Sequence, residues 1–237
     1  MLILFDNVLK RSTVSSSNES LNYPSENLID DFLRLRYQCG ATSDTIEFAL
    51  DDSYDISSIF TGYASGITTA NVKLYDGVTL KKTIALGTAI NDETQAIHFV
   101  TEIGIDKITI EITGSIGMYI GGMAAGICYD MGNVLSPFEE KITDRSIVSS
   151  SPYGQVQQNY IPPLDSIFFI FRLKPRDERN TIVDEFKAIG NGATIWVDYF
   201  EDNHDFKKPQ YVTVSSQVAP SKVLREYTVS INLTEAR

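Results

Sequence analysis

The chain has 237 residues, of which 43% are apolar and 22% are charged. This composition is typical of a folded globular protein and excludes wholesale disorder. The formal net charge of −11 arises from 20 basic and 31 acidic residues, so the surface as a whole repels the phosphates of nucleic acids. The densest basic stretch, residues 172–179, is interrupted by Asp177 and Glu178, and we therefore expect no nucleic-acid partner.

Three further features limit where the chain can act. Its only cysteines, Cys39 and Cys128, form no disulfide framework, which suits a protein that folds in a reducing cytoplasm. The longest uncharged run, residues 113–129, is shorter than the roughly 20 residues that span a bilayer and contains five glycines. The first six residues lack the basic leader of a signal peptide. We expect no membrane span and no export by a standard signal.

The beginning of the chain gives mixed signals. Residues 11–20 are polar and rich in serine, which predicts a loop. Residues 25–37 leave two alternatives open, because the apolar residues from Leu28 onward have the spacing of a short helix, whereas those nearest Tyr37 alternate as in a strand.

Residues 44–112 carry a clear strand signal. Apolar and polar side chains alternate over residues 45–50, and the Asp76–Gly77 turn pair after residues 72–75 is typical of a hairpin. Residues 96–100 and 107–112 are predicted as two separate strands. Several short strands at roughly ten-residue spacing indicate a β-sandwich or jelly roll.

One helix is predicted, over residues 177–189. Asp177 is suited to cap its first turn, and Gly190 follows its last residue, where a left-handed conformation is commonly needed. An apolar stripe along one side predicts that this side packs against strands. The stripe consists of Ile182, Val183, Phe186 and Ile189.

The rest of the second half is predicted as strands. Residues 130–151 are polar and predict a connection, whereas residues 166–173 are apolar on both faces and predict a buried strand. Further strands are predicted over residues 194–200, 211–214 and 225–233. The expected fold is therefore mainly β, with two β-sandwich modules: residues 1–115, which are jelly-roll-like, and residues 116–237, which carry the flanking helix.

No pattern of catalytic or metal-binding residues is recognisable. His98 and His204 have no second His or Cys at ligand spacing, and no nucleotide-binding, serine-hydrolase or zinc-protease motif occurs. The acidic clusters at residues 51–55 and 198–205 offer oxygen ligands for calcium, but neither has EF-hand spacing. We expect solvated loops there, and hence no catalytic residue, no metal, no cofactor and no enzymatic activity.

Aromatic residues are the remaining candidates for ligand binding, because flat rings stack on the apolar faces of sugars. The sequence does not separate exposed rings from core rings, so the ligand-binding residues stay unassigned, and most of the rings are expected in the core. The candidates in the first module are Tyr37, Tyr54, Phe60, Tyr63 and Tyr75.

Three segments of the first half, residues 22–30, 34–37 and 45–50, resemble the opening of galactose-binding-like, discoidin-type jelly rolls. The likeness is carried by the phrase Asn-Tyr-Pro-Ser-Glu-Asn-Leu at residues 22–28 and by the alternating strand at residues 45–50. At Tyr37 the chain departs from the tryptophan that is usual in the aromatic strand of that family. The resemblance implies a jelly roll that contacts glycans on a host surface.

The second half resembles modules of siphophage-type tail proteins in the order and spacing of its segments. These are the Ile-Gly-Gly-Met phrase at residues 120–123, the serine-rich segment 144–155, the helix and the strand at 194–200. The resemblance implies a structural component of the phage tail in the virion, assembled in the cytoplasm of the host bacterium. Its implied partners are further copies of itself in a ring, and other tail proteins. The alternative is a carbohydrate-binding protein whose second domain is a scaffold.

Overall fold

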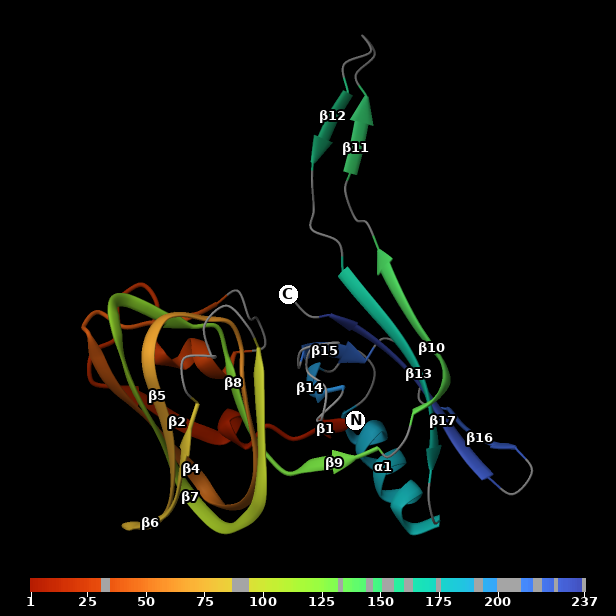
Figure 1. Ribbon diagram of the computed structural model, residues 1–237, viewed down its shortest axis with the longest axis horizontal. Helices are drawn as coiled ribbons and strands as arrows, with labels where there is room; N and C mark the ends of the chain where they lie inside the picture. The colour runs from red at the N-terminus through yellow and green to blue at the C-terminus, as the bar shows by residue number, and fades with distance from the viewer. Residues whose placement is uncertain are drawn as a thin grey trace. The chain divides into compact units, whose positions relative to one another are not determined.

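The computed structural model describes residues 1–30, 35–86, 94–131, 134–143, 147–150, 156–159, 164–173, 176–189, 194–199, 210–214, 219–223 and 226–235. The chain divides into two compact units. The first unit combines Met1–Asp130 with Ile195–Tyr211, and the second combines Met131–Thr194 with Val212–Ala236. The predicted fold class is confirmed, since the described residues form many strands and one α-helix (Figure 1).

The first unit is built from antiparallel strands in the order β2-β4-β7-β5-β6, with β3 paired to β7 and β8 to β4. Two of these strands, β4 and β7, are long and curved, and register shifts divide the pairing between them into separate stretches. The first part of β4 pairs with residues 107–113 of β7, whereas its last part pairs with residues 95–98 and with β8. Such bending produces the layers of a jelly-roll sandwich. The strands are β2 (Ser12–Ser16), β3 (Tyr37–Gln38), β4 (Ser43–Thr61), β5 (Ala64–Asp76), β6 (Thr79–Ala85), β7 (Gln95–Ile120) and β8 (Met123–Gly126).

The structure changes three of the local expectations. The two strands predicted at 96–100 and 107–112 are one strand, β7, which bends at Gly104 with a φ of 73° instead of ending there. The predicted loop at residues 11–20 contains β2, because its backbone pairs with β4. The ambiguous segment contains a short 3₁₀ helix, η2 (Ser25–Ile29), and then β3.

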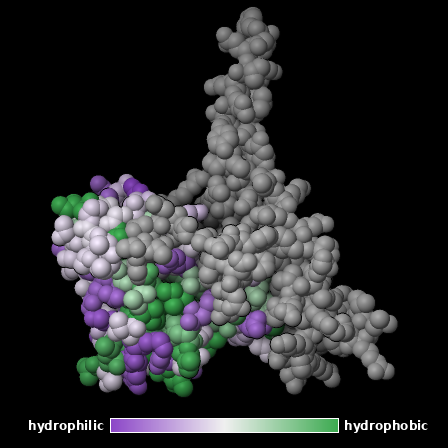
Figure 2. Space-filling view, in the orientation of Figure 1, coloured by the Kyte–Doolittle hydropathy of each residue, from purple (hydrophilic) through white to green (hydrophobic). Residues whose placement is uncertain are grey.

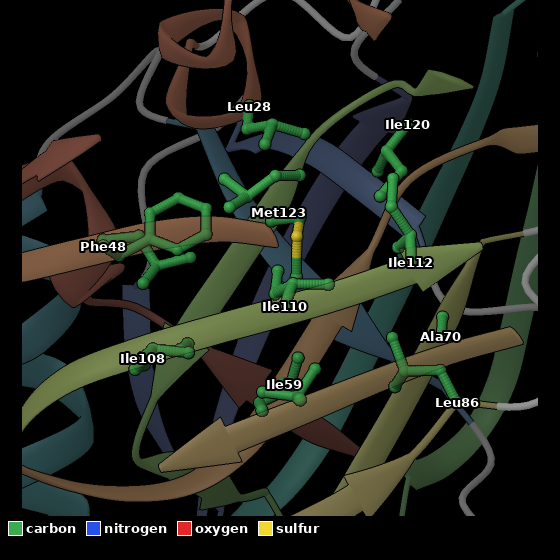
Figure 3. Packing of buried hydrophobic residues seen from close by; sticks show 14 of the residues in the cluster. Leu28, Phe48, Ile59, Ala70, Leu86, Ile108, Ile110, Ile112, Ile120 and Met123 are labelled. Atoms are coloured by element: carbon green, nitrogen blue, oxygen red, sulfur yellow. The ribbon is translucent and has the colours of Figure 1, made fainter. Parts of the chain in front are cut away.

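The core of the first unit lies between its layers. Figure 3 shows side chains from distant segments meeting there, with Met123 of β8 placed near Leu28 of η2 and Ile110 of β7. The isoleucines at 108, 110 and 112 are at most 1% exposed, as expected for alternate residues on the inner face of one strand. The uncharged run 113–129 includes β8, all four residues of which are buried, and also Ile116 and Ile127, which are 73% and 43% exposed.

A small set of strands brings residues 195–198, from late in the chain, into the first unit. β1 (Leu2–Leu4) pairs on one side with β9 (Cys128–Asp130) and on the other with β14 (Thr194–Asp198). The boundary predicted at residues 115/116 therefore differs from the structure, because it falls inside β7. Residues 195–211, assigned from sequence to the second module, belong to the first unit.

The second unit contains an antiparallel sheet in which β13 lies between β10 and β17, and β15 and β16 both pair with β17. Residues 130–151, predicted as a connection, contain two strands, and Pro137 lies at a register shift of the first of them, where a missing N–H is tolerated. A two-stranded sheet, β11-β12, continues the hairpin between β10 and β13. The elements are β10 (Val134–Thr143), β11 (Ile147–Ser150), β12 (Val156–Asn159), β13 (Leu164–Leu173), β15 (Gln210–Val214), β16 (Ala219–Val223) and β17 (Glu226–Glu235).

The predicted helix is α1 (Arg176–Ile189), one residue longer at its start than expected. Ile182, Val183 and Phe186 of the apolar stripe are buried, as predicted, and Ile189 is partly buried. Asp177 is the second residue of α1 and so does not hold the N-cap position predicted for it, whereas the helix-ending role of Gly190 lies outside the described residues. Of the helices that the structure describes, none has both the length and the apolar character needed to cross a membrane.

Candidate functional site

The candidate site lies on the outer face of the first unit, where the end of β7 is flanked by β3 and β5. Ile120 of β7 is paired with Tyr37 and with Ala64, and all three side chains are fully buried. Because side chains alternate along a strand, the neighbouring triple faces outward. This outward triple is Tyr119, Gln38 and Ser65.

Arg36 joins this face from the residue before β3. The central carbon of its guanidinium lies 4.4 Å from the ring centroid of Tyr119 and 5.2 Å from that of Tyr23. The backbone holds Tyr23 in place, since its carbonyl accepts a 3.1 Å hydrogen bond from the N–H of Gln38. The turn that carries Tyr23 is thereby attached to β3, and the two tyrosines share one cation.

A third tyrosine extends the face. Tyr63 precedes β5, and its carbonyl accepts a 2.6 Å hydrogen bond from the N–H of Gly121, just after β7. Tyr63 lies two residues before Ser65, the spacing at which side chains of an extended chain share one face. It is 45% exposed, and Tyr23 is 36% exposed. We name Tyr23, Arg36, Gln38, Tyr63 and Tyr119 together the outer patch.

The outer patch combines apolar ring faces with hydrogen-bonding groups. Gln38 donates from Nε2 to the carbonyl of Gly117 at 3.1 Å, which fixes the amide and leaves its oxygen as an acceptor. The Arg36 guanidinium supplies N–H donors, and the tyrosine hydroxyls both donate and accept. A sugar presents an apolar C–H face and a rim of hydroxyls, so this set of groups matches both sides of its chemistry.

The five aromatic residues considered from sequence separate into core and surface. Tyr37 and Phe60 are fully buried, and Phe60 packs against Trp196 with ring centroids 5.7 Å apart. Tyr54 and Tyr75 are partly buried, and each has a cation over its ring. Tyr63 is the one member of the five in the outer patch.

Sequence reasoning missed Tyr23 and Tyr119 as binding candidates. A signal for Tyr23 existed in the Tyr-Pro phrase, but that phrase was interpreted as a mark of the fold. Tyr119 follows Met118 and precedes Ile120, which are both buried, so strand alternation alone indicates an outward ring. The strand was not predicted this far, because glycines interrupt the sequence there.

Behind the outer patch, a buried carboxylate anchors β3 and β2. Asp44 is 4% exposed, and its two oxygens accept hydrogen bonds from three segments of the chain. The hydroxyl groups of Ser16 and Ser17 donate at 2.5 Å, and the N–H of Thr45 donates at 2.7 Å. The remaining donors are the backbone N–H groups of Ser17 and Asn18 and the hydroxyl of Tyr37.

These hydrogen bonds determine the charge state of the anchor. Burial by itself raises the pKa of Asp44, but the hydrogen bonds, led by those from Ser16 and Ser17, outweigh burial and hold the pKa below its ordinary value. Burial, followed by the hydrogen bond to Asp44, raises the pKa of Tyr37. The pair is therefore an ionised carboxylate and a neutral phenol that donates to it.

His98 makes a contact that the sequence did not indicate. Its Nδ1 lies 2.8 Å from the hydroxyl of Ser58, and its Nε2 lies 2.9 Å from Oδ2 of Asp198. The order Ser–His–Asp matches that of hydrolases, but Ser58 and Asp198 are 1% and 0% exposed. The hydroxyl therefore lies inside the first unit, and we interpret the chain of hydrogen bonds as a fastening of β14.

The acidic clusters do not form a shared site in the described residues. Asp51 accepts from the hydroxyl of Tyr54, Asp52 from the N–H of Ser53, and Asp55 from the N–H of Gly104. In the second cluster Asp198 is bonded to His98, and residues 200–205 lie outside the described part. Within that part, no group of three or more His, Cys, Asp or Glu side chains is placed to hold a metal ion.

Comparison with models of protein families finds no match, and comparison with curated protein sequences finds none. Several solved structures have a similar fold over about half of the chain. One is a family 32 carbohydrate-binding module from Clostridium perfringens, CpGH89CBM32-5, in complex with GalNAc-β-1,3-galactose, at 13% identity and a TM-score of 0.45. It is covered completely, by 52% of this chain.

Two others have comparable scores. The family 32 module of C. perfringens NanJ, in complex with galactose, has 19% identity and a TM-score of 0.43, with 53% of this chain covering 98% of it. Chitosan-binding module 1 of a chitosanase/glucanase from Paenibacillus sp. IK-5 has 14% identity and a TM-score of 0.43, at 51% and 98% coverage. Likeness at TM-scores below 0.5 carries no conclusion about the ligand of this chain.

Proposed function

We propose that this protein binds glycans through the outer patch of its first unit. The observation that carries the proposal is the gathering of three tyrosines, one arginine and one glutamine on one face, with Tyr23 and Tyr63 exposed. Tyrosine rings supply rigid contact area at a low entropy cost, and the donors beside them orient hydroxyl groups. Figure 2 shows hydrophilic and hydrophobic residues interspersed on one face of this unit.

The test is a glycan array probed with the full chain, followed by calorimetric titration of the best ligand. Tyr119→Ala and Tyr23→Ala should each weaken binding severalfold, up to about tenfold, since stacking on one ring contributes on the order of 0.5–1.5 kcal/mol. Tyr75→Ala is the matched control, because Tyr75 also carries a cation over its ring but lies outside the patch. Equal losses in all three variants, or no binding on the array, would contradict the proposal.

The proposed role is binding without turnover. The hydroxyl that faces a histidine, that of Ser58, is buried, and the outer patch holds no carboxylate pair suited to glycoside cleavage. Incubation of a bound glycan with the protein should leave the glycan intact by mass spectrometry. Appearance of shortened products would replace the binding role with an enzymatic one.

A second candidate is the structural role in a phage tail, with copies of this chain in a ring. The observation that favours assembly is the two-stranded sheet β11-β12, whose strands pair with no other strand in the part of the chain that the structure describes. A two-stranded sheet is marginally stable alone in water, and open strand edges pair with other chains. The second unit would then be the scaffold and the outer patch would contact the host surface.

This candidate predicts where the protein is found. Mass spectrometry of purified virions should detect it at a fixed copy number, because closed rotational symmetry fixes the number of subunits in a ring. It would be assembled in the host cytoplasm beside other tail proteins. Absence from purified particles, together with glycan binding by the free protein, would leave the first candidate alone.

A further inference from the structure

We propose that the outer patch selects glycans that carry a carboxylate, and that Arg36 binds this carboxylate. The inference rests on the proposed glycan-binding function and names the class of sugar, that of uronic and sialic acids. It follows from the charge of Arg36, for which the described residues supply no ion-pair partner.

Among the described residues, no carboxylate lies within ion-pair distance of Arg36. Its guanidinium contacts the rings of Tyr23 and Tyr119, and its carbonyl accepts a 2.9 Å hydrogen bond from Nδ2 of Asn27. No described side chain accepts a hydrogen bond from the guanidinium. In a chain of net charge −11, an arginine with this surrounding is unusual enough to require an explanation.

Other cations of the same unit provide the contrast. Arg11 also lies over a tyrosine ring, that of Tyr54 at 5.4 Å, but its Nη2 is 2.6 Å from Oδ1 of Asp6. All four lysines in strands β5, β6 and β7 pair with a carboxylate at 2.5–3.9 Å. Arg11, Lys82 and Lys107 also lie over aromatic rings, so Arg36 differs from these three cations in having no counter-ion among the described residues.

Two carboxylates in neighbouring segments of the chain are engaged elsewhere. Glu19 accepts from the N–H and the hydroxyl of Ser25 at 2.9 and 2.8 Å. Asp44 lies behind β3, where it is 4% exposed and accepts six hydrogen bonds. Neither Glu19 nor Asp44 is therefore available to compete with an external carboxylate at the guanidinium.

The two tyrosines prepare the guanidinium for such a ligand. A cation–π contact is made by the positive charge and leaves the N–H donors of arginine available. The rings also restrict the long side chain, so less entropy is lost when a carboxylate binds. A carboxylate accepts two parallel hydrogen bonds from one guanidinium, while the sugar ring that bears it is placed beside the tyrosines.

The experiment compares acidic glycans with their own methyl esters, which differ in charge and share the sugar ring. The full chain is titrated with a uronic-acid oligosaccharide, a sialylated oligosaccharide and the ester of each. We expect at least one acid to bind about tenfold or more tightly than its ester, with a preference that shrinks as salt is raised. Arg36→Gln should abolish the preference, whereas Arg11→Gln, the matched control, should retain it.

Arg36→Lys keeps the charge and serves if Arg36→Gln fails to fold, as judged by circular dichroism. It should retain a reduced preference, because an ammonium cannot form the two parallel hydrogen bonds. Equal binding of acid and ester, with loss of both in Tyr119→Ala, would overturn the acidic-sugar inference and leave glycan binding in place. Binding of no glycan, acidic or neutral, would overturn the proposed function and the inference together.

Discussion

Asp44 shows how one buried residue supports the face that carries the outer patch. Its carboxylate joins β2, through Ser16 and Ser17, to Tyr37 of β3. Tyr37 is also paired with Ile120 at the end of β7, so the anchor lies directly beneath the proposed site. Loss of the negative charge at Asp44 would weaken its hydrogen bonds to all three of the segments that it connects.

The pH dependence of stability tests this anchor. Because the pKa of Asp44 is lower in the folded protein than in the unfolded chain, ionisation contributes stability above about pH 4, and this contribution is lost as the pH falls through the folded pKa. Urea unfolding between pH 7 and pH 3 should show this decline. Asp44→Asn should reduce the free energy of unfolding at pH 7 by on the order of 2 kcal/mol and flatten the decline.

Asp52→Asn is the control, because Asp52 is exposed in the same strand. It should unfold as the unaltered protein does at each pH. A pH profile of Asp44→Asn that runs parallel to that of the unaltered protein would mean that other groups cause the acid sensitivity.

The contact between His98 and Asp198 predicts a coupled pair. Removing one partner leaves the other buried, so His98→Ala should cost about 3–5 kcal/mol of stability. Trp196, the only tryptophan of the chain, lies two residues from Asp198 and is 4% exposed, so its emission should shift to the red if β14 loosens. Adding Asp198→Ala to His98→Ala should cost less than the sum of the two single changes. Additive costs would show that the two side chains act independently.

At the scale of elements, strands β5 and β7 approach each other closely at Gly66 and Gly114. A side chain at Gly114 would place its Cβ 2.0 Å from the carbonyl oxygen of Gly66, beside the register shifts of β5. Gly114→Ala should therefore lower the free energy of unfolding by about 3 kcal/mol or more. Gly40→Ala, whose Cβ would meet its nearest neighbour at 3.4 Å, should have little effect. Similar melting temperatures for the two variants would contradict this account.

The helix of the second unit supplies a matched pair of variants one residue apart. Phe186 is 4% exposed, whereas the side chain of Lys187 is 71% exposed and pairs with Asp184. Phe186→Ala should cost about 3–5 kcal/mol, and Lys187→Ala less than about 1 kcal/mol. Chemical denaturation of both variants provides the measurement. An unchanged midpoint for Phe186→Ala would show that the stripe does not contribute to the core.

At the scale of the whole molecule, the chain leaves the first unit after Asp130 and re-enters it at Ile195. The returning strand β14 buries all of residues 195–198 and brings Trp196 against Phe60. The first unit is thus completed only by residues made after those of helix α1. A linear division of the chain into two consecutive modules does not describe it.

No metal is required by any of these contacts, and we predict that chelation leaves the whole molecule unchanged. The melting temperature should be the same with and without EDTA, because the described carboxylates at residues 51–55 each have a protein donor. A drop with EDTA that calcium restores would point to ligands in the acidic segment 198–205.

Several features followed from sequence patterns. Alternation predicted the strands at 45–50 and 72–75, the Asp76–Gly77 pair predicted the hairpin that joins β5 to β6, and the apolar stripe predicted the helix and its buried side. These patterns act between residues a few positions apart, so the sequence alone determined them. The mainly β class also followed from these patterns. The acidic net charge and the scarcity of cysteine followed from composition alone.

Only the tertiary structure decided which rings face outward and which residues meet. The outer patch gathers residues 23, 36, 38, 63 and 119, and His98 is 100 positions from Asp198. Residues 12–16 are polar enough for a loop, yet their backbone pairs with β4, and Asp44 accepts hydrogen bonds from Ser16 and Ser17 at the end of this pairing. The physical reason is that a hydrogen bond or a cation–π contact forms wherever the fold brings the groups together, whatever the number of residues between them.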